Sequence, residues 1–317
     1  MNGRVLVTGG AGFIGSHTVA TLLRRGRKVT VIDDLSTGTR ANLDGPHLEG
    51  LRGDLEFVEG SIVDQAALDR AMRGVDRVVH LAALPSVARS LEKPLDTHHA
   101  CATGTAQVLF AAHRHKARVV YAGSSSAYGN QQEQWKHEAM REDPLSPYSA
   151  AKLAGELYCR SFARVYGLPV VVTRFFNVFG PRQTPDSVYS GVVAAFCFAL
   201  LRGRQPRIDG DGGQSRDFTY VEDVVDGVLL ALDADTRGCE IVNLAYGRSC
   251  TVTELLQELC RVAGRTVEPV YAPPRAGDVR HSLADVTRAK SVLGFAPKVG
   301  FAEGIQRTFD WYRSQYS

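Results

Sequence analysis

The sequence has few cysteines, and none of them are paired. Its six cysteines are widely scattered and form no CxxC pair: Cys101, Cys159, Cys197, Cys239, Cys250 and Cys260. Disulfide frameworks and structural zinc sites require closely spaced or paired thiols, so neither is expected, and no metal site is predicted. The pattern is typical of buried, reduced thiols, and we expect a cytoplasmic protein.

Excess charge and long apolar runs are also missing. The 37 basic and 34 acidic residues leave a net charge of +3 over 317 residues, too little to indicate a nucleic-acid partner. No apolar run is long enough to span a bilayer, and no signal-peptide pattern precedes the first apolar segment, so no membrane association is expected. Hydrophobic residues at 44% and charged residues at 22% are typical of a soluble globular enzyme.

The first motif in the sequence is a glycine-rich turn between an apolar run and an amphipathic segment, in RVLVTGGAGFIGSHTVATLLRRG. The turn fits GxGxxG through Gly10 and also GxxGxxG. Between a strand and a helix, such glycines let the backbone approach a pyrophosphate, which the helix N-terminus attracts. The residues expected to contact a dinucleotide here are Gly9, Gly12, Phe13, Ile14 and Gly15.

The next apolar run, KVTVIDDLSTG, ends in a carboxylate, Asp33, 18 residues after Gly15. A carboxylate there can accept both hydroxyls of an adenosine ribose and would repel a 2′-phosphate, so NAD is favoured over NADP. A turn or helix-capping aspartate is the alternative. The cofactor is expected to contact Asp33, Asp34, Ser36, Thr37 and Gly38.

Strand-like and helix-like runs then alternate. Strands are expected at 55–60, 76–83, 117–126 and 169–180, and helices at 64–73, 95–115 and 147–166. This alternation predicts an α/β fold with a doubly wound parallel sheet of the Rossmann type. We expect an NAD-binding domain at 1–177 and a smaller α/β substrate-binding domain at 178–317, with residues 218–245 packing back on the first.

A tyrosine and a lysine stand four residues apart in the third predicted helix. Ser146 and Pro147 fit its cap and first position, and Tyr148 and Lys152 would share one face. An ammonium beside a phenol favours the phenolate, a usable base. Ser124, at the tip of the preceding strand, could share a substrate hydroxyl with the pair. The alternative is that both are ordinary surface residues. In a parallel sheet, however, the carboxyl ends of the strands lie along one edge, so the polar residues at the strand ends are expected to lie near this pair.

Eight segments together resemble the NAD-dependent epimerase/dehydratase family, an extended short-chain dehydrogenase/reductase family, and within it the UDP-glucose and UDP-N-acetylglucosamine 4-epimerases. They span essentially the whole chain: TGGAGFIGSH, VIDDLSTG, HLAAL, SSSAYG, SPYSAAK, RFFNVFGPRQ, DGDGGQSRDFTYVEDV and PRAGDVRHSLADV. The resemblance implies an isomerase in which NAD stays bound. A tyrosinate takes the proton of the sugar 4-hydroxyl while C4 gives its hydride to nicotinamide, and the 4-keto sugar turns and takes the hydride back on its other face.

The resemblance also implies roles for the catalytic residues. Tyr148 is the base, Lys152 lowers its pKa and holds the nicotinamide ribose, and Ser124 hydrogen-bonds the 4-oxygen. Dehydratases of the family carry an Asp-Glu pair just after this serine, where the chain has Ser125 and Ser126. Epimerisation is therefore expected, with another NAD-dependent nucleotide-sugar enzyme, such as a dehydratase or reductase, as the alternative. An inactive NAD-binding regulator is a third possibility, although such proteins commonly lose the tyrosine or the lysine.

Further cofactor contacts are implied at Ser61, Ile62, Leu81, Ala82 and Ala83. The chain departs from the family at one of these contacts and at one other region. Ser61 stands where the family has an aspartate, and Cys101 and Thr103 stand where it has two asparagines. A thiol is a poor hydrogen-bonding replacement for an amide.

The substrate-binding residues implied by the resemblance bind a UDP-sugar. Two arginines match the diphosphate ligands, which suits the fork geometry of a guanidinium. Ser282 stands where UDP-glucose-restricted epimerases hold a tyrosine, so it leaves room for an acetamide. UDP-GlcNAc and UDP-GalNAc are therefore the expected pair, UDP-glucose and UDP-galactose possible additions, and restriction to the latter the alternative. The residues expected at the substrate are Ser86, Ser124, Ser125, Ser126, Tyr148, Asn177, Arg216, Arg275, Asp278 and Ser282.

The family usually forms homodimers through a four-helix bundle, here built from 95–115 and 147–166. Four apolar residues suit that bundle, although they would equally suit packing within the chain: Val108, Leu109, Leu153 and Leu157.

Overall fold

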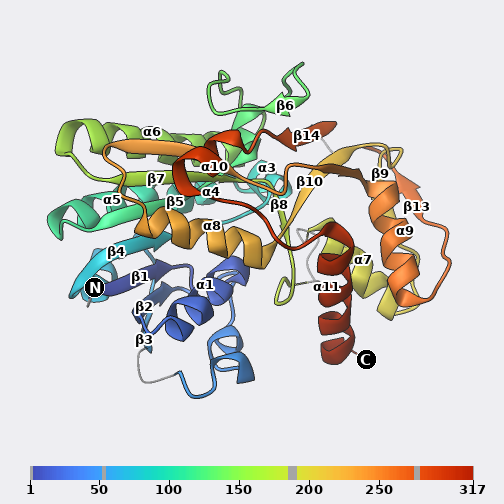
Figure 1. The fold of residues 1–317 in the computed structure, drawn as a ribbon, viewed down its shortest axis with the longest axis horizontal. Coiled ribbons are helices and arrows are strands. Elements are labelled where there is room, and N and C mark those ends of the chain that lie inside the picture. The colour runs from blue at the N-terminus through green and yellow to red at the C-terminus, as the bar shows by residue number, and fades with distance from the viewer. Residues whose placement is uncertain (1–2, 52–54, 185–190, 275–278, 317) are drawn as a thin grey trace.

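A seven-stranded parallel sheet forms the larger part of the protein in the computed structural model, which describes residues 3–51, 55–184, 191–274 and 279–316 (Figure 1). Its strand order is β11-β7-β5-β4-β1-β2-β3. The strands are β1 (Arg4–Thr8), β2 (Lys28–Asp33), β3 (Leu55–Glu59), β4 (Val75–His80), β5 (Arg118–Ser124), β7 (Val170–Phe175) and β11 (Cys239–Leu244). The predicted doubly wound parallel sheet is confirmed.

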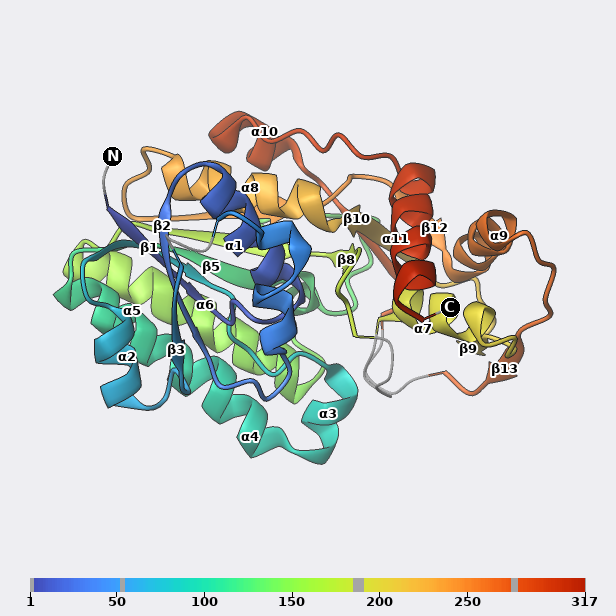
Figure 2. The same ribbon diagram turned by 90° about the horizontal axis from the view of Figure 1, so that it is seen from below.

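Helices cover both faces of this sheet (Figure 2). One layer holds α1 (Phe13–Arg24) and α8 (Val221–Asp233), and the other holds α2 (Gln65–Ala71), α5 (Gly104–Arg114) and α6 (Pro147–Tyr166). Because both faces are covered, the central strands have no polar side; all six residues of β7, for example, are buried. The strand order changes direction between β1 and β4, and in such sheets ligands bind beside the carboxyl ends at this point.

Helix α6 has strong local start and stop signals. Ser146 and Ser149 form a reciprocal capping box, Pro147 occupies the first turn, and Gly167 ends the helix in a left-handed conformation at φ 66°. The helix spans the predicted 147–166. The predicted helix at 95–115 is different, because α4 (Pro94–His98) and α5 are separated by η4 (His99–Thr103), a π-helical turn. Such turns insert one residue into a helix and often occur at functional sites.

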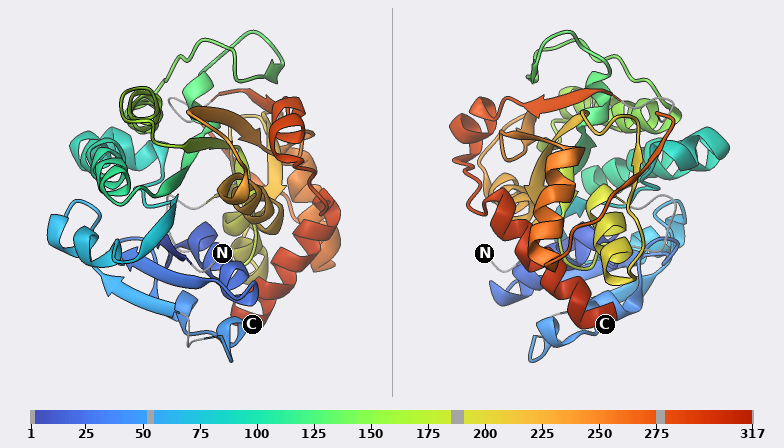
Figure 3. Two further views of the ribbon diagram at one scale, coloured as in Figure 1. Left: turned by 60° about the vertical axis from the view of Figure 1, so that its left-hand side comes forward. Right: turned by 90° about the vertical axis from the view of Figure 1, so that its right-hand side faces the viewer.

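The second part of the protein is built on short strands. A five-stranded sheet contains β6 (Trp135–Lys136), β8 (Asn177–Phe179), β10 (Ser215–Tyr220), β12 (Ser249–Thr251) and β14 (His281–Ala284), and β9 (Arg207–Asp209) pairs with β13 (Val270–Ala272). The helices α7 (Val192–Leu201), α9 (Val252–Ala263) and α11 (Phe301–Tyr316) lie side by side at one end of the molecule (Figure 3). The remaining short elements are η1 (Arg40–Leu43), η2 (Pro46–Leu48), α3 (Val87–Glu92), η5 (Ser125–Tyr128) and α10 (Thr287–Leu293).

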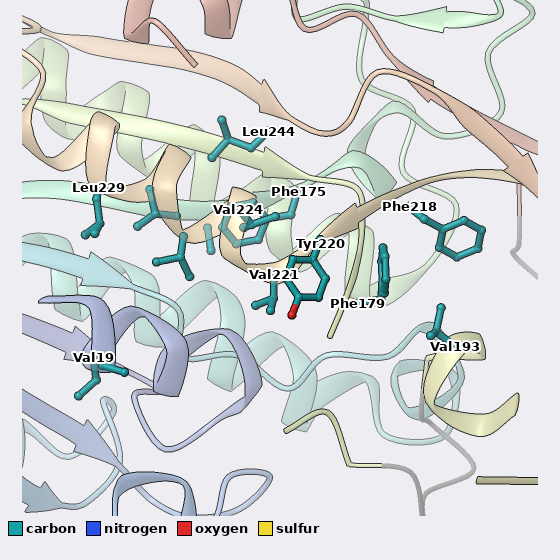
Figure 4. Close-up of a cluster of buried hydrophobic side chains, with 14 of the residues drawn as sticks. Val19, Phe175, Phe179, Val193, Phe218, Tyr220, Val221, Val224, Leu229 and Leu244 are labelled. Atoms are coloured by element: carbon teal, nitrogen blue, oxygen red, sulfur yellow. The ribbon is translucent and has the colours of Figure 1, made fainter. Parts of the chain in front are cut away.

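One hydrophobic core joins the two parts (Figure 4). It runs from α1 and α8 beneath the main sheet to an aromatic cluster in which the Phe179 ring lies 6.4 Å from Phe218 and 5.7 Å from Tyr220. The chain also returns after α8 to place β11 beside β7 in the main sheet. Residues on both sides of position 177 therefore build the main sheet and share its core.

Strand β11 forms an edge of the main sheet, and side chains cover its outer side. Arg288 donates to the carbonyl of Ile241 at 2.9 Å, and Glu138 accepts the N–H of Asn243 at 2.7 Å. The opposite edge of the sheet is β3.

A buried ion pair connects α6 to the main sheet. Arg174 of β7 is fully buried and donates twice to Glu156 of α6, at 2.9 Å and 2.6 Å. Glu142 accepts a further bond from Arg174 at 2.8 Å. The guanidinium carbon also lies 4.6 Å from the ring centroid of Tyr128. Because a buried charge is costly without a partner, this pair fixes the seat of α6 on the sheet.

The six cysteines are free thiols, of which Cys101, Cys159 and Cys197 are buried. Within the described ranges, no helix has both the length and the apolar run needed to cross a bilayer.

Replacing Glu156 by glutamine should lower the free energy of unfolding by about 3 kcal/mol, because the buried charge of Arg174 would lose the bidentate one of its two carboxylate partners and keep only Glu142. Equilibrium urea unfolding measures this change. The matched control is Glu303→Gln, which removes an ion pair with Arg307 whose side chains are 54% and 45% exposed. That control should change stability by less than about 1 kcal/mol. Equal losses in the two variants would contradict the structural role of Arg174 and Glu156.

Candidate active site

The turn after β1 forms a tight backbone cradle. Gly9 has φ 69°, and its carbonyl accepts the N–H of Gly12 at 3.2 Å. A Cβ atom at Gly15 would lie 2.1 Å from the Gly9 carbonyl oxygen, so no other residue fits there without moving the turn. In the described part of the chain, no side chain caps the start of α1. Its first N–H groups are therefore available to an anion.

Asp33 ends β2 beside this cradle and is buried. One carboxylate oxygen accepts the N–H of Ala11 in the glycine turn, and the other accepts the N–H of Leu35, both at 2.9 Å. Burial raises the pKa of Asp33, and these two bonds lower it. The carboxylate thus holds the glycine turn in addition to its predicted ribose role, for which each oxygen has further acceptor capacity. Asp34, Ser36 and Thr37 are exposed beside it, and Gly38 packs against Ala11.

A buried hydrogen-bond chain runs through His80 at the end of β4. Thr105 donates to the carbonyl of Cys101 at 2.5 Å, so it accepts from Nε2 of His80 at 2.9 Å. Nδ1 then accepts from Thr8 at 2.7 Å, and Thr8 accepts the N–H of Ala82 at 3.1 Å. Burial lowers the pKa of His80 to about 3, so the imidazole is neutral. The chain ties the π-helical turn of 99–103 to the end of β1 and to the segment holding Leu81, Ala82 and Ala83.

The three serines form a turn at the end of β5. Ser124 caps η5 by accepting the N–H of Ser126 at 3.2 Å, and the two hydroxyls lie 2.8 Å apart. In the sheet register, Ser124 lies opposite Phe175, two residues before Asn177. Tyr148, at the start of α6, is half-buried. Burial raises the pKa of its phenol well above the ordinary value, the neighbouring Cys101 raises it further, and a hydrogen bond with Ser124 lowers it. The side chains of Ser124 and Tyr148 are therefore within hydrogen-bonding distance of each other.

Lys152 lies one turn further along α6 and is buried. Its ammonium stands 4.5 Å from the ring centroid of Tyr121, which also donates its hydroxyl to the Lys152 carbonyl at 2.9 Å. Gly155 makes room for this hydroxyl, because a Cβ there would lie 2.4 Å from it. Burial lowers the pKa of Lys152, and the thiols of Cys101 and Cys159 raise it. Cys101 thus lies close enough to influence both Tyr148 and Lys152.

Three of the residues predicted to bind substrate lie on β10 and the strands that pair with it. Arg216 of β10 lies opposite Ser282 of β14, and both are largely buried. Asn177 begins β8, which pairs with β10 at Phe218. Nη1 of Arg216 donates to the carbonyls of Ser215 and Arg280 at 2.8 Å and 3.1 Å. The two remaining predicted residues, Arg275 and Asp278, lie outside the described residues.

Asp217, next to Arg216, holds three segments together. One of its oxygens accepts from the N–H of Tyr246 at 3.0 Å and the other from the N–H of Gly247 at 2.9 Å, with Ala284 of β14 donating at 3.3 Å. Burial raises the pKa of Asp217 to about 6, although these bonds lower it. Asp217 thereby fixes the pairing that places Arg216 beside Ser282.

Other predicted contacts have local structural roles. Ser86 has φ 137° and caps α3 by accepting the N–H of Arg89 at 3.2 Å. The carbonyl of Ser61 accepts the N–H of Asp64 at 3.0 Å in the turn after β3, where Ile62 is buried.

The residues present fit a dinucleotide. The glycine cradle and the uncapped start of α1 suit a pyrophosphate, and the carboxylate of Asp33 suits a ribose. Ser124, Tyr148 and Lys152 lie further along the same carboxyl edge of the main sheet. A dinucleotide bound along this edge would therefore lie beside a phenol and an ammonium.

Several polar residues here were not singled out in the sequence, among them Asp217, Asn243 and the Arg174–Glu156 pair. Arg174 and Asn243 each interrupt an apolar strand, in VVVTRFF and EIVNLAY. A polar residue inside a buried strand signals a buried partner, but it does not say which one.

Comparison with known proteins identifies the family. The model of the NAD dependent epimerase/dehydratase family matches residues 5–245. The chain belongs to this family. It is 39% identical over 315 residues to a UDP-glucose 4-epimerase from Mycolicibacterium smegmatis, covering 98% of this chain and 99% of that protein. It is also 37% identical over 320 residues to a dTDP-glucose 4,6-dehydratase from Streptomyces niveus, covering 98% and 93%.

A solved structure has the same fold over nearly the whole length. The UDP-N-acetylglucosamine 4-epimerase from Methanobrevibacter ruminantium M1, in complex with UDP-N-acetylmuramic acid, matches with a TM-score of 0.93 and 37% identity, covering 99% of each chain. The predicted family, the NAD cofactor and the class of enzyme, an isomerase, are confirmed by these likenesses.

Proposed function

We propose that this protein interconverts UDP-GlcNAc and UDP-GalNAc through a transient 4-keto sugar, and that it also accepts UDP-glucose and UDP-galactose. The observation that carries the choice of sugar is Ser282. Its small side chain lies on β14 directly opposite Arg216, and we infer that the larger side chain of a tyrosine there would narrow the sugar pocket. The likeness to an epimerase named for UDP-N-acetylglucosamine supports this choice.

In the proposed reaction, NAD supplies the oxidation and the return reduction at C4 when it is bound. Residues 9–15 hold its pyrophosphate and Asp33 its adenosine ribose, with further contacts from 34–38, 61–62 and 81–83. Lys152 holds the second ribose. The contacts of the glycine turn and of Asp33 are assigned from the cradle geometry and the position of the strand end, and the other contacts, including that of Lys152, from the resemblance to the family.

Tyr148 serves as the base for the 4-hydroxyl, and Ser124 hydrogen-bonds the same oxygen. An isolated tyrosine titrates near pH 10, and burial moves the pKa of Tyr148 higher still. The phenolate must therefore be stabilised by nearby positive charge and by hydrogen bonds. The Ser124 hydroxyl supplies a hydrogen bond, and we assign the positive charge to Lys152, one turn further along the same helix.

On the substrate side, Arg216 and Arg275 bind the diphosphate with Asn177, and Asp278 binds the nucleoside ribose. Ser86, Ser125 and Ser126 complete the sugar pocket. A second candidate, dehydration, is favoured by the 37% identity to a dTDP-glucose 4,6-dehydratase. Elimination of water needs an acid beside the keto sugar, and the hydroxyls of Ser125 and Ser126 are too weakly acidic for that role. The site residues therefore favour epimerisation, although the overall sequence identity would also allow a dehydratase.

We also propose a homodimer formed by the outer faces of α4, α5 and α6. Of the four apolar residues named for the bundle, Val108 and Leu109 are fully buried within the chain, whereas Leu157 is 51% exposed. Other large apolar side chains are exposed on the same helices: Leu95, Phe110, Tyr158, Val165 and Tyr166. A second copy of this surface would cover them.

Tyr148→Phe should abolish turnover of UDP-GlcNAc, a fall in kcat of at least about 1,000-fold, because it removes the proton acceptor. Affinity for the UDP-sugar, measured by calorimetry, should change less than about threefold, since the diphosphate ligands remain. An active Phe variant would exclude Tyr148 as the base.

Incubating the wild-type protein with UDP-GlcNAc, without added NAD, should yield UDP-GalNAc with no change in mass. Ser282→Tyr should then lower kcat/KM for UDP-GlcNAc more than about tenfold, because the ring occupies the acetamide space, while UDP-glucose changes less than about threefold. Ser282→Ala is the matched control and should keep both activities. Loss of water from the sugar would favour the dehydratase, and turnover of UDP-glucose alone by the wild type would refute the role of Ser282.

Leu157→Arg should convert the dimer to a monomer, because it places a charge in the apolar contact. Light scattering after size-exclusion chromatography measures the mass. The control Leu230→Arg changes a side chain that is 40% exposed on α8, on the other face of the sheet. A wild-type protein that is monomeric at micromolar concentration would contradict the proposed interface.

A further inference from the structure

Asn243, at the carboxyl end of β11, uses its whole side chain to connect other segments. It is fully buried. Its Oδ1 accepts from the hydroxyl of Tyr128 at 2.7 Å, and its Nδ2 donates to the carbonyls of Lys136 at 2.8 Å and Asp285 at 3.0 Å. Both N–H groups of the amide are thus used, and their partners lie in other segments than Tyr128, the partner of the amide oxygen.

On the acceptor side, Tyr128 is the last residue of η5, the turn that carries Ser124, Ser125 and Ser126. Its ring is buried against the guanidinium of Arg174, which Glu156 of α6 holds through two bonds. Glu156 lies one turn beyond Lys152 on the same helix. The serine turn and the helix of Tyr148 are therefore fixed to each other through the Tyr128 side chain.

On the donor side, Lys136 ends β6 and Asp285 directly follows β14. These two strands pair at Leu283 with Trp135 and at Ala284 with Lys136. Ser282 precedes this pairing on β14 and lies opposite Arg216. The two amide bonds therefore hold the strand that carries the proposed pocket residue.

We propose that Tyr128 and Asn243 are positioning residues of the epimerase reaction, setting the distance between the serine turn at the 4-oxygen and strand β14 at the sugar pocket. This inference rests on the proposed function. Neither side chain need touch the sugar. Hydrogen bonds are directional, and a displacement of about 1 Å between reacting groups can cost about 100-fold in rate. Arg216 has additional bonds of its own, to the carbonyls of Ser215 and Arg280, and its neighbour Asp217 binds Tyr246, Gly247 and Ala284, so we expect nucleotide binding to depend less on this connection than turnover does.

The test compares Tyr128→Phe with the wild-type protein. The variant keeps the ring over Arg174 and loses the hydroxyl, and with it the bond to Asn243 and a hydrogen bond with Arg174. We expect kcat for UDP-GlcNAc to fall about tenfold, while the Kd for UDP, measured by calorimetry, stays within about twofold. Asn243→Ser removes both sides of the connection and should lower kcat at least as much; it also serves if Tyr128→Phe does not fold.

The matched control is Thr308→Val in α11, which deletes another buried hydroxyl, bonded to the Gly304 carbonyl at 2.7 Å. Unfolding free energies are measured for all variants, and the control should keep the wild-type kcat. A kcat within twofold of wild type in Tyr128→Phe would overturn the inference, as would a parallel loss of UDP affinity or an equal loss of kcat in Thr308→Val. If the wild-type protein interconverts no UDP-sugar pair, the proposed function fails first, and this assignment falls with it.

Discussion

The buried pair of Arg174 and Glu156 is the constraint on which the site depends most. A guanidinium inside a parallel sheet is stable only with a carboxylate in hydrogen-bonding geometry, and one side of this pair belongs to β7 while the other belongs to α6. Their bidentate contact fixes how α6 is rotated and where it sits along the sheet. That rotation decides where Tyr148 and Lys152 point. The same guanidinium lies over Tyr128, so the serine turn is placed by the same contact.

Burial affects the protonation of the site residues as well as their positions. Desolvation raises the pKa of Tyr148 and lowers that of Lys152. Burial alone therefore favours the neutral form of both side chains. The neutral His80 behind them brings no competing charge. In a partly desolvated site, a single added cation or hydrogen bond acts more strongly than it would in water. The site is thus built so that the protonation of its phenol responds to what is bound beside it.

Sequence reasoning predicted the parts of the fold that depend on local patterns. The glycine turn, the alternating strands and helices, and α6 with its serine cap and proline all follow from short-range rules. Features that depend on long-range contacts could not be predicted. Nothing in HHACAT indicated a π-helical turn, and nothing near Asp33 showed that it also holds the glycine turn. Asn243 stood out only as a polar residue among apolar ones, and Asp217 did not stand out at all, since their partners lie tens of residues away. For Val108 and Leu109, a dimer surface and packing within the chain were equally compatible with the sequence, because periodicity gives the apolar face of a helix but not what covers it.

The covered edge of the main sheet has a consequence for how copies of the chain meet. An open edge strand offers unpaired backbone groups to any other strand, and this is a common route to uncontrolled aggregation. On β11, a guanidinium and a carboxylate already occupy outward-facing groups at Ile241 and Asn243. A neighbouring strand would have to displace two charged side chains before it could extend the sheet. The protein can therefore expose apolar helices to a partner while the β11 edge of its sheet resists extension by a neighbouring strand.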